Sequence, residues 1–321
     1  MVVASLAVAG CGSASVRDLP PAAEPRDSPP PAVSPDGTQI VVGGSPEGLA
    51  FDRASGTLAV GLRDPDGVAL VDAATGRLEH TVALPANPRH AAAGGGVFYV
   101  PAEAAGQLYA IRARDGRVLW HTPVGPFPHG VAALPGGAVV GTERGNQIVF
   151  ARAGHVSARV PVAVQPGGVA AVGAAGRVAV VSVRERVMEL YSAIGSHPRV
   201  ASAPAGVGPT HVVAAGNLAF VADTQGDALL VYKLAPQLVI VNRLRLASGP
   251  YGIAIDPARR RVWVSLTGTN RLAEVSATAH PRLLAEFATV RQPNDVAVDS
   301  QTGRVFVAGT AGRSVQVLDA P

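Results

Sequence analysis

The chain has 321 residues, of which 48% are hydrophobic and only 16% charged, with 37 Gly and 27 Pro. This composition suits short strands and turns and argues against disorder over most of the length. The formal net charge is +4 and no run of five basic residues occurs, so a nucleic-acid-binding surface is not expected. The single cysteine, Cys11, leaves no disulfide and no cysteine-based metal site.

The first residues are typical of a processing signal. A short apolar stretch ends in small residues, and it is too short to predict a membrane-spanning helix. Its end, Val8-Ala9-Gly10-Cys11, resembles a bacterial lipobox. The resemblance implies removal of residues 1–10, lipidation of Cys11, and a lipid-anchored position on the extracytoplasmic side of a bacterial membrane. The alternatives are a chance match on an ordinary signal peptide or a buried tail.

A Pro-rich segment follows the cysteine and includes Ser28-Pro29-Pro30-Pro31. Such a composition predicts a tether without a core of its own. We therefore expect residues 11–37 to join the lipobox cysteine to a folded domain.

The rest of the chain is a repeat. A proline recurs at spacings of 38 to 43 residues, and three short apolar runs separated by Gly, Asn or Asp turns follow it each time. In residues 248–275 these runs are Ile253–Ile255, Val262–Val264 and Leu272–Val275, which is typical of an antiparallel meander. The anchor prolines are Pro46, Pro88, Pro128, Pro166, Pro209, Pro250 and Pro293.

A period near 40 residues with several strands per unit predicts a β-propeller. We expect an all-β fold over residues 38–321, with seven blades of four antiparallel strands. A β-solenoid or a β-sandwich also has short strands and turns, but the regular proline anchor favours a radial or stacked repeat. The last repeat lacks a fourth strand, so residues 38–43 should pair antiparallel with Val315–Leu318 and close the ring.

Two resemblances accompany the repeat. Arg304-Val-Phe-Val-Ala-Gly, Asn217-Leu-Ala-Phe-Val-Ala-Asp and Gly96-Val-Phe-Tyr-Val-Pro resemble the repeat of YVTN-type propellers and their surface-layer and NHL-like relatives. Those families include extracellular binding proteins, scaffolds and some enzymes. The run from Leu108 to Trp120 resembles the repeat of quinoprotein-type propellers. That family is usually eight-bladed, and its quinone-dependent members often use adjacent cysteines. Since this chain has neither feature, no bound quinone is expected, while a scaffold role like that of quinoprotein-like lipoproteins stays open.

No catalytic motif occurs, but one group of polar residues stands out. The two residues after each anchor proline fall where the innermost strand enters the central channel, so their side chains should gather at one mouth. Neutral histidine is a common metal ligand or general base. The mouth is therefore a candidate ligand-binding site, and its alternative is an ordinary wet, polar channel. The candidate residues are Glu47, Arg89, His90, His129, His211, Tyr251, Asn294 and Asp295.

Two functions follow from these observations. The first is a lipid-anchored, monomeric envelope propeller that binds a small ligand or another envelope protein. The second is a hydrolase or lyase that holds a divalent metal at the mouth, as some lactonase-like and NHL-like propellers do. Whether the protein is an enzyme, and which residue would be catalytic, stays open. Convergence of two or more of the three histidines, Glu47 and Asp295 on a common point would favour the metal site.

Overall fold

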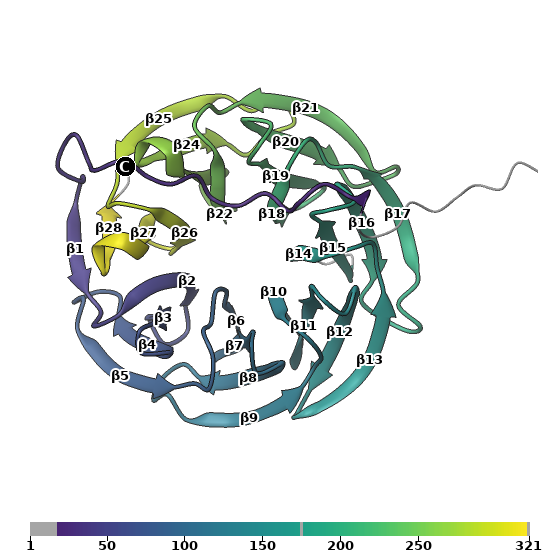
Figure 1. Ribbon diagram of the computed structural model, residues 1–321, viewed down its shortest axis with the longest axis horizontal. Coiled ribbons are helices and arrows are strands. Elements are labelled where there is room, and N and C mark those ends of the chain that lie inside the picture. The colour runs from purple at the N-terminus through teal and green to yellow at the C-terminus, as the bar shows by residue number, and fades with distance from the viewer. Residues whose placement is uncertain (1–17, 174–175, 320–321) are drawn as a thin grey trace, which may run out of the picture.

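The computed structural model describes residues 18–173 and 176–319, which form a ring of seven four-stranded antiparallel sheets around a central channel (Figure 1). The predicted seven-bladed propeller is confirmed. Cys11 and the lipobox lie outside the described residues. Within the described ranges, no helix is long and apolar enough to cross a membrane.

Each blade runs outward from the channel in chain order. Blade one consists of β2 (Ser45–Asp52), β3 (Thr57–Arg63), β4 (Gly67–Asp72) and β5 (Leu78–Ala83). Blade two consists of β6 (Ala92–Gly94), β7 (Val97–Ala102), β8 (Gln107–Arg112) and β9 (Val118–Pro123). Blade three consists of β10 (Pro128–Leu134), β11 (Gly137–Thr142), β12 (Gln147–Arg152) and β13 (His155–Pro161). Blade four consists of β14 (Pro166–Val172), β15 (Arg177–Ser182), β16 (Val187–Ser192) and β17 (Arg199–Pro204). Blade five consists of β18 (Pro209–Ala215), β19 (Leu218–Asp223), β20 (Ala228–Lys233) and β21 (Val239–Arg245).

The last two blades contain short 3-10 turns between their second and third strands. Blade six consists of β22 (Pro250–Asp256), β23 (Arg261–Leu266), η3 (Thr267–Thr269), β24 (Arg271–Ser276) and β25 (Leu283–Ala288). Blade seven consists of β26 (Pro293–Val298), β27 (Arg304–Gly309), η4 (Thr310–Gly312), β28 (Ser314–Asp319) and, as its outer strand, β1 (Thr38–Val41).

The ring closes between the two ends of the repeat region. Strand β1 pairs antiparallel with β28, with Thr38 opposite Val317 and Val41 opposite Ser314. A hydrophobic cluster spans the junction between blades seven and one, where Phe51 stacks on Phe306 at a centroid distance of 5.9 Å. The predicted closure is confirmed, and it satisfies the edge of β28 that would otherwise lie open.

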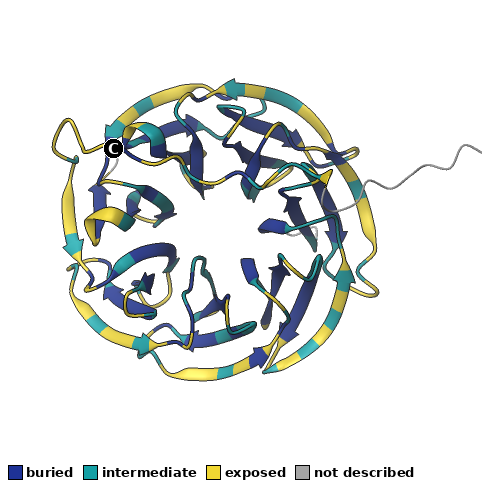
Figure 2. Ribbon diagram, viewed as in Figure 1, coloured by how far each residue is buried: buried dark blue, intermediate teal, exposed yellow. Residues whose placement is uncertain are grey.

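The core lies between neighbouring blades. The inner three strands of each blade are largely buried, while the outermost strands alternate between exposed and half-buried residues (Figure 2). Between blades five and six, for example, Phe220, Leu229, Val264 and Val275 form part of one buried cluster. Burial of such side chains removes apolar surface from water at roughly 25 cal/mol per Å², so a blade is stable only against its neighbours.

β-Bulges follow the anchor prolines at the channel. In β10, Pro128 is opposite Thr142 and Val131 is opposite Val140, so His129 and Gly130 lie opposite a single residue. The same irregularity occurs in β18 between Pro209 and Val212. A bulge bends the strand and redirects a side chain, and these two bulges contain residues that prove to meet at the mouth.

The segment before β1 crosses one face of the ring. Figure 1 shows it running in front of β18 and β22 toward blade seven. Arg184 donates a hydrogen bond of 2.6 Å to the carbonyl of Leu19, and Asn270 donates one of 2.8 Å to the carbonyl of Pro29. Ala23, between these points, is buried. The Pro-rich composition had suggested only a tether; from Asp18 to Pro30 the chain instead forms what we call the strap.

Candidate functional site

Three histidines from three blades meet at the channel mouth. His90 precedes β6, His129 lies in β10 and His211 lies in β18. The Nε2 atom of His90 lies 2.9 Å from Nε2 of His129 and 3.3 Å from Nε2 of His211. One ligand nitrogen from each of the three rings lies within 4.8 Å of the others. His129 is one residue after its anchor proline, and His90 and His211 are two residues after theirs, so all three come from the same short stretch of the repeat.

Glycines let the channel narrow enough for this contact. A Cβ on Gly48 would lie 2.7 Å from the Cα of His90, and a Cβ on Gly168 would lie 3.1 Å from the Cα of His211. A glycine in a strand commonly marks such a close approach of two backbones. Neither glycine has a positive φ, so the space next to the histidines, and not an unusual backbone conformation, explains these residues.

Hydrogen bonds behind two of the rings determine which nitrogen faces the centre. His129 Nδ1 lies 2.5 Å from Oε1 of Glu103, and His211 Nδ1 lies 3.1 Å from the carbonyl oxygen of Tyr251. Each Nδ1 must carry the proton to donate to such an acceptor, so Nε2 of a neutral ring keeps a lone pair. Both Nε2 atoms face Nε2 of His90.

The local electrostatics keep His90 and His211 uncharged. Burial, with the neighbouring charges of His129, His211 and Arg89, holds the pKa of His90 well below its usual range. Burial, followed by the proximity of His129, lowers the pKa of His211 to about 3. Neutral imidazole is the form that binds metal ions, so these two rings need lose no proton at neutral pH.

The arrangement matches the donor set of a metal centre. Two nitrogens bound at 2.0–2.1 Å to a tetrahedral ion lie about 3.4 Å apart. The Nε2 atoms of His90 and His211 are 3.3 Å apart, close to this value, whereas those of His90 and His129, at 2.9 Å, would have to separate slightly to hold an ion. The acceptors behind His129 and His211 are of the kind that orients metal-binding histidines. A fourth donor is near, because Oε1 of Glu143 lies 3.9 Å from Nε2 of His129.

Two predicted mouth carboxylates do not join the cluster. Glu47 pairs with Arg63 at 3.0 Å, and its other oxygen lies 3.9 Å from Nε of Arg89. Asp295 accepts a hydrogen bond of 2.8 Å from the backbone N–H of Leu49 in the adjoining blade. Glu47 thus joins Arg63 of its own blade to Arg89 of blade two, and Asp295 joins blade seven to blade one, so both carboxylates have partners outside the histidine cluster.

Histidines of the cluster line two small hollows. On the channel side, His90, His211 and Asp295 line a cavity of about 160 Å³ whose other walls are mainly small apolar residues. Burial raises the pKa of Asp295 to about 7, although backbone hydrogen bonds from Leu49 and Val296 act against this.

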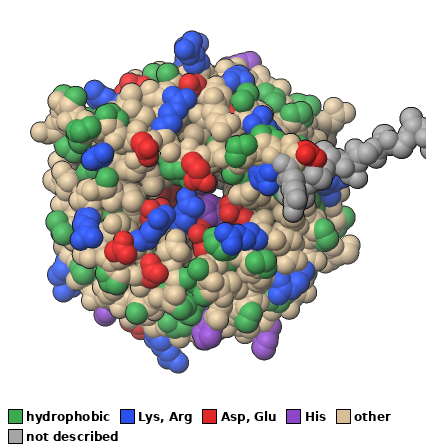
Figure 3. Space-filling model, viewed as in Figure 1, with side chains coloured by type: hydrophobic (Ala, Val, Ile, Leu, Met, Phe, Trp, Pro, Cys, Tyr) green, Lys and Arg blue, Asp and Glu red, His purple; other side chains and the backbone are tan. Residues whose placement is uncertain are grey.

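On the outer side, the strap covers a smaller pocket of about 40 Å³. The pocket is lined by Ala22, Ala23 and Glu24 of the strap and by ring residues that include Arg89, His129, Glu143, His211 and Tyr251. Asn294 lies nearby, where its side-chain oxygen accepts a 3.1 Å hydrogen bond from Gln292. Figure 3 shows this face, with histidine at its centre among acidic and basic side chains.

One known protein family matches more than half of the chain. Residues 17–238 match the family described as outer membrane protein assembly factor BamB. The chain belongs to this family. The match contains the run from Leu108 to Trp120 that resembles quinoprotein-type repeats, and it does not bear out the YVTN label. No curated protein sequence matches the chain.

Solved structures share the fold of this BamB-family chain. Hydrazine synthase of Kuenenia stuttgartiensis has 15% identity and a TM-score of 0.74, with 89% of this chain and 98% of that chain covered. A streptogramin B lyase has 12% identity and a TM-score of 0.74, with 88% and 96% covered. Virginiamycin B lyase from Staphylococcus aureus has 13% identity and a TM-score of 0.73, with 88% and 99% covered. At these identities the likeness concerns the fold alone.

Sequence reasoning missed the roles of Glu103 and Glu143 in the BamB-family chain. Both lie in loops, after β7 and β11, and the pattern of residues after the anchor prolines does not indicate that either would contact a histidine. The repeat register predicts height in the ring, whereas the contact of Glu103 with His129 depends on how adjacent blades pack.

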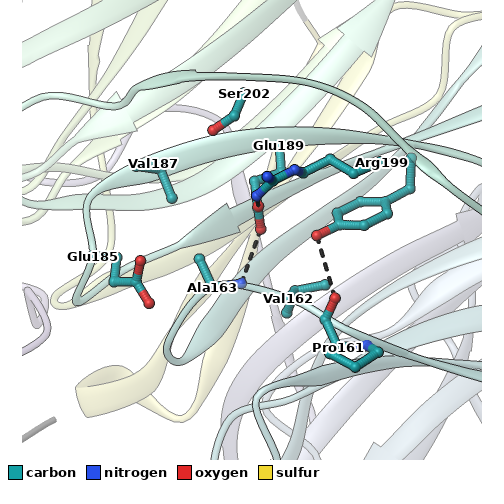
Figure 4. A pocket seen from close by; sticks show the side chains of 9 residues that line it. Pro161, Val162, Ala163, Glu185, Val187, Glu189, Arg199 and Ser202 are labelled. Atoms are coloured by element: carbon teal, nitrogen blue, oxygen red, sulfur yellow. Dashed lines mark hydrogen bonds and ion pairs between the residues drawn. The ribbon is translucent and has the colours of Figure 1, made fainter. Parts of the chain in front are cut away.

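A second hollow lies between blades three and four, away from the mouth (Figure 4). It measures about 500 Å³ and contains the buried carboxylate of Glu189. That carboxylate pairs with Arg199 at 2.7 Å and accepts a hydrogen bond from the N–H of Ala163, while Tyr191 Oη donates to the carbonyl of Pro161. These polar groups satisfy one another and join two blades, so the hollow is a weaker candidate site than the mouth.

Proposed function

We propose that this BamB-family propeller binds a divalent transition-metal ion at its channel mouth through Nε2 of His90, His129 and His211. One observation carries the proposal: Nε2 of His129 and Nε2 of His211 are directed at Nε2 of the third ring, His90, by contacts of their Nδ1 atoms on the far sides. A buried acceptor left unmatched costs roughly 1–3 kcal/mol, whereas a bound cation would use all three nitrogens.

The donor set indicates the kind of ion. Imidazole nitrogens suit Zn²⁺, Cu²⁺, Ni²⁺ and Fe²⁺, whereas Ca²⁺ and Mg²⁺ prefer oxygen ligands. Three histidines with one open position are typical of a zinc centre that also binds a water or a ligand. Glu143, 3.9 Å from His129 Nε2, is placed to complete the set or to accept a proton from a water at the open position.

The biological setting we propose is the bacterial envelope. The family is described as an outer membrane protein assembly factor, and the lipobox-like run ending at Cys11 supports a lipid anchor on the extracytoplasmic side. In this setting the propeller acts as a binding or scaffold module whose mouth takes a small ligand or part of an envelope protein.

A metal-dependent hydrolase or lyase is the second candidate. It is favoured by the open position beside Glu143 and by Asp295, whose pKa of about 7 suits a general acid or base. Measurement of turnover on candidate esters and lactones separates this function from binding alone.

Metal content tests the proposal. The purified chain is stripped with a chelator, dialysed, and titrated with Zn²⁺ and Co²⁺ by calorimetry, and bound metal is then measured by mass spectrometry. We expect one ion per chain and an affinity at least about 100-fold lower for His129→Ala, since one of three ligands is lost. His155→Ala, which removes an exposed histidine of β13, is the control. The absence of stoichiometric binding to the wild type would refute the metal centre.

A further inference from the structure

Arg89 lies in the wall of the strap-covered pocket with most of its hydrogen-bonding capacity unused. Its side chain is only 22% exposed. In the described part of the chain, its hydrogen bond is a long one of 3.4 Å from Nη2 to Tyr251 Oη. The carboxylates of Glu24 and Glu47 lie at 3.8 and 3.9 Å. Although burial acts against it, Tyr251 and the carboxylates of Glu103, Glu47 and Glu24 raise the pKa of Arg89, so its charge is already supported. A guanidinium has five N–H donors, and it is these unused donors that a small ligand with oxygen acceptors would satisfy.

The size of the pocket limits that ligand. A water molecule takes up about 30 Å³ of liquid, and the pocket measures about 40 Å³. With the strap in place, the pocket is small and suits a compact polar group such as one carboxylate. The hydroxyl of Tyr251 accepts from Arg89 and keeps its own proton to donate to such a group.

Charge balance points the same way. A divalent ion at the histidines, with Arg89 and Arg63, would place four positive charges around the mouth. Three carboxylates lie beside these groups: Glu47 on the arginines, Glu103 on His129, and Glu143 near His129 Nε2. The fourth negative charge is that of Glu24 on the strap, whose side chain is 68% exposed and 3.8 Å from Arg89. Glu24 thus occupies the place of an anionic ligand without making a close contact.

We propose that the strap-covered pocket is a carboxylate subsite, in which a small free monocarboxylate binds between the metal ion and Arg89 in competition with Glu24. This inference rests on the proposed metal centre. A free small acid is favoured over a carboxylate of a partner protein because the strap lies over the pocket and leaves it little room. The strap is held on both sides, by the ion pair of Arg26 with Asp227 at 2.9 Å and by the hydrogen bonds of Arg184.

The test uses the full chain loaded with Co²⁺, whose visible absorption reports a change of ligand. Acetate is titrated, with acetamide and inorganic phosphate as neutral and tetrahedral comparisons. We expect a saturable spectral change with acetate only. Arg89→Met should weaken acetate binding about tenfold or more, because a hydrogen bond to a charged group contributes about 1.5–3 kcal/mol. Arg114→Met, a change of an exposed arginine outside the pocket lining, should leave acetate binding unaltered.

Variants of the strap provide a second part of the same experiment. Glu24→Gln removes the internal competitor and should tighten acetate binding several-fold, whereas Asp27→Asn, an exposed acid of the same strap, should not. Arg89→Lys keeps the charge and loses the planar fork, so it should bind acetate less well than the wild type. It serves as the test variant if Arg89→Met melts below the assay temperature.

The outcomes separate the two proposals. If Co²⁺ does not bind the wild type, the metal centre fails and the carboxylate subsite fails with it. If Co²⁺ binds but acetate leaves the spectrum unchanged, or Arg89→Met and Arg89→Lys both bind acetate like the wild type, only the subsite is overturned. Equal binding of phosphate would overturn the assignment of the ligand as a carboxylate. An unchanged acetate affinity in Glu24→Gln would overturn the competition.

Discussion

Glu103 orients His129: its Oε1 lies 2.5 Å from His129 Nδ1, and both side chains are buried. This contact places the lone pair of Nε2 toward His90, and it therefore links a loop of blade two to the geometry of the whole cluster.

Removal of this carboxylate should weaken the proposed metal centre without abolishing it. We expect Glu103→Ala to lower the affinity for Zn²⁺ about 10- to 100-fold, as is usual for groups that orient metal-binding histidines. Glu103→Gln should retain more affinity, since its amide oxygen can still accept from Nδ1. Calorimetry measures both, with Glu79→Ala, a change in an exposed ion pair with Arg77, as the control. Equal affinities for the Ala variant and the wild type would contradict the positioning role.

Asp295 should make stability depend on pH. Its carboxyl has an ordinary pKa of 3.8 and a folded pKa of about 7, raised chiefly by burial and also by Glu47. Between these values the unfolded chain loses a proton that the folded chain keeps, so the free energy of unfolding falls as pH rises from 4 to 7, by roughly 1.4 kcal/mol per unit. Above pH 7 this contribution is constant.

The variant Asp295→Asn isolates that contribution, because other titrating groups are common to both proteins. Relative to the wild type, its melting temperature should rise between pH 5 and pH 8, measured by calorimetry with a chelator present. The Asn oxygen can still accept from the N–H of Leu49. A melting-temperature difference that stays the same across this range would show that Asp295 is not shifted as stated.

Two truncations should separate the strap from ring closure. A chain that begins at residue 31 loses the strap hydrogen bonds of Arg184 and Thr267 but retains β1, so its melting temperature should fall by only a few degrees. A chain that begins at residue 44 also loses β1 and leaves β28 as an open edge, and it should unfold at a much lower temperature or aggregate. Similar melting curves for the two truncations would contradict this account of closure.

Lipidation at Cys11 stays a prediction from the sequence. In a bacterial host, Cys11→Ala should move the protein from the membrane fraction to the soluble fraction, because the thioether to the lipid can no longer form. Immunoblots of the two fractions measure this change. Mass spectrometry that finds an unmodified Cys11 in membrane-associated wild-type protein would refute the prediction.

The sequence alone determined the blade count, the closure and the height of the mouth residues. Anchor prolines from Pro46 to Pro293 mark each innermost strand, and the missing fourth strand of the last repeat indicated pairing with residues 38–43; the structure confirms both. These properties follow from local periodicity, because equal positions in a repeat lie at equal heights in a closed ring. The same short stretch of the repeat placed His90, His129 and His211 at the mouth.

Only the tertiary structure decided which of these residues touch. Whether the three histidines meet depends on the width of the channel, which Gly48 and Gly168 set by allowing backbones of adjacent blades to approach. The packing of adjacent blades also decides which carboxylate contacts a histidine. Glu47 pairs with Arg63 and does not contact the cluster, while Glu103 is hydrogen-bonded to His129. The strap lies over the mouth because its backbone finds donors on distant blades, and such contacts leave no periodic trace in a Pro-rich sequence.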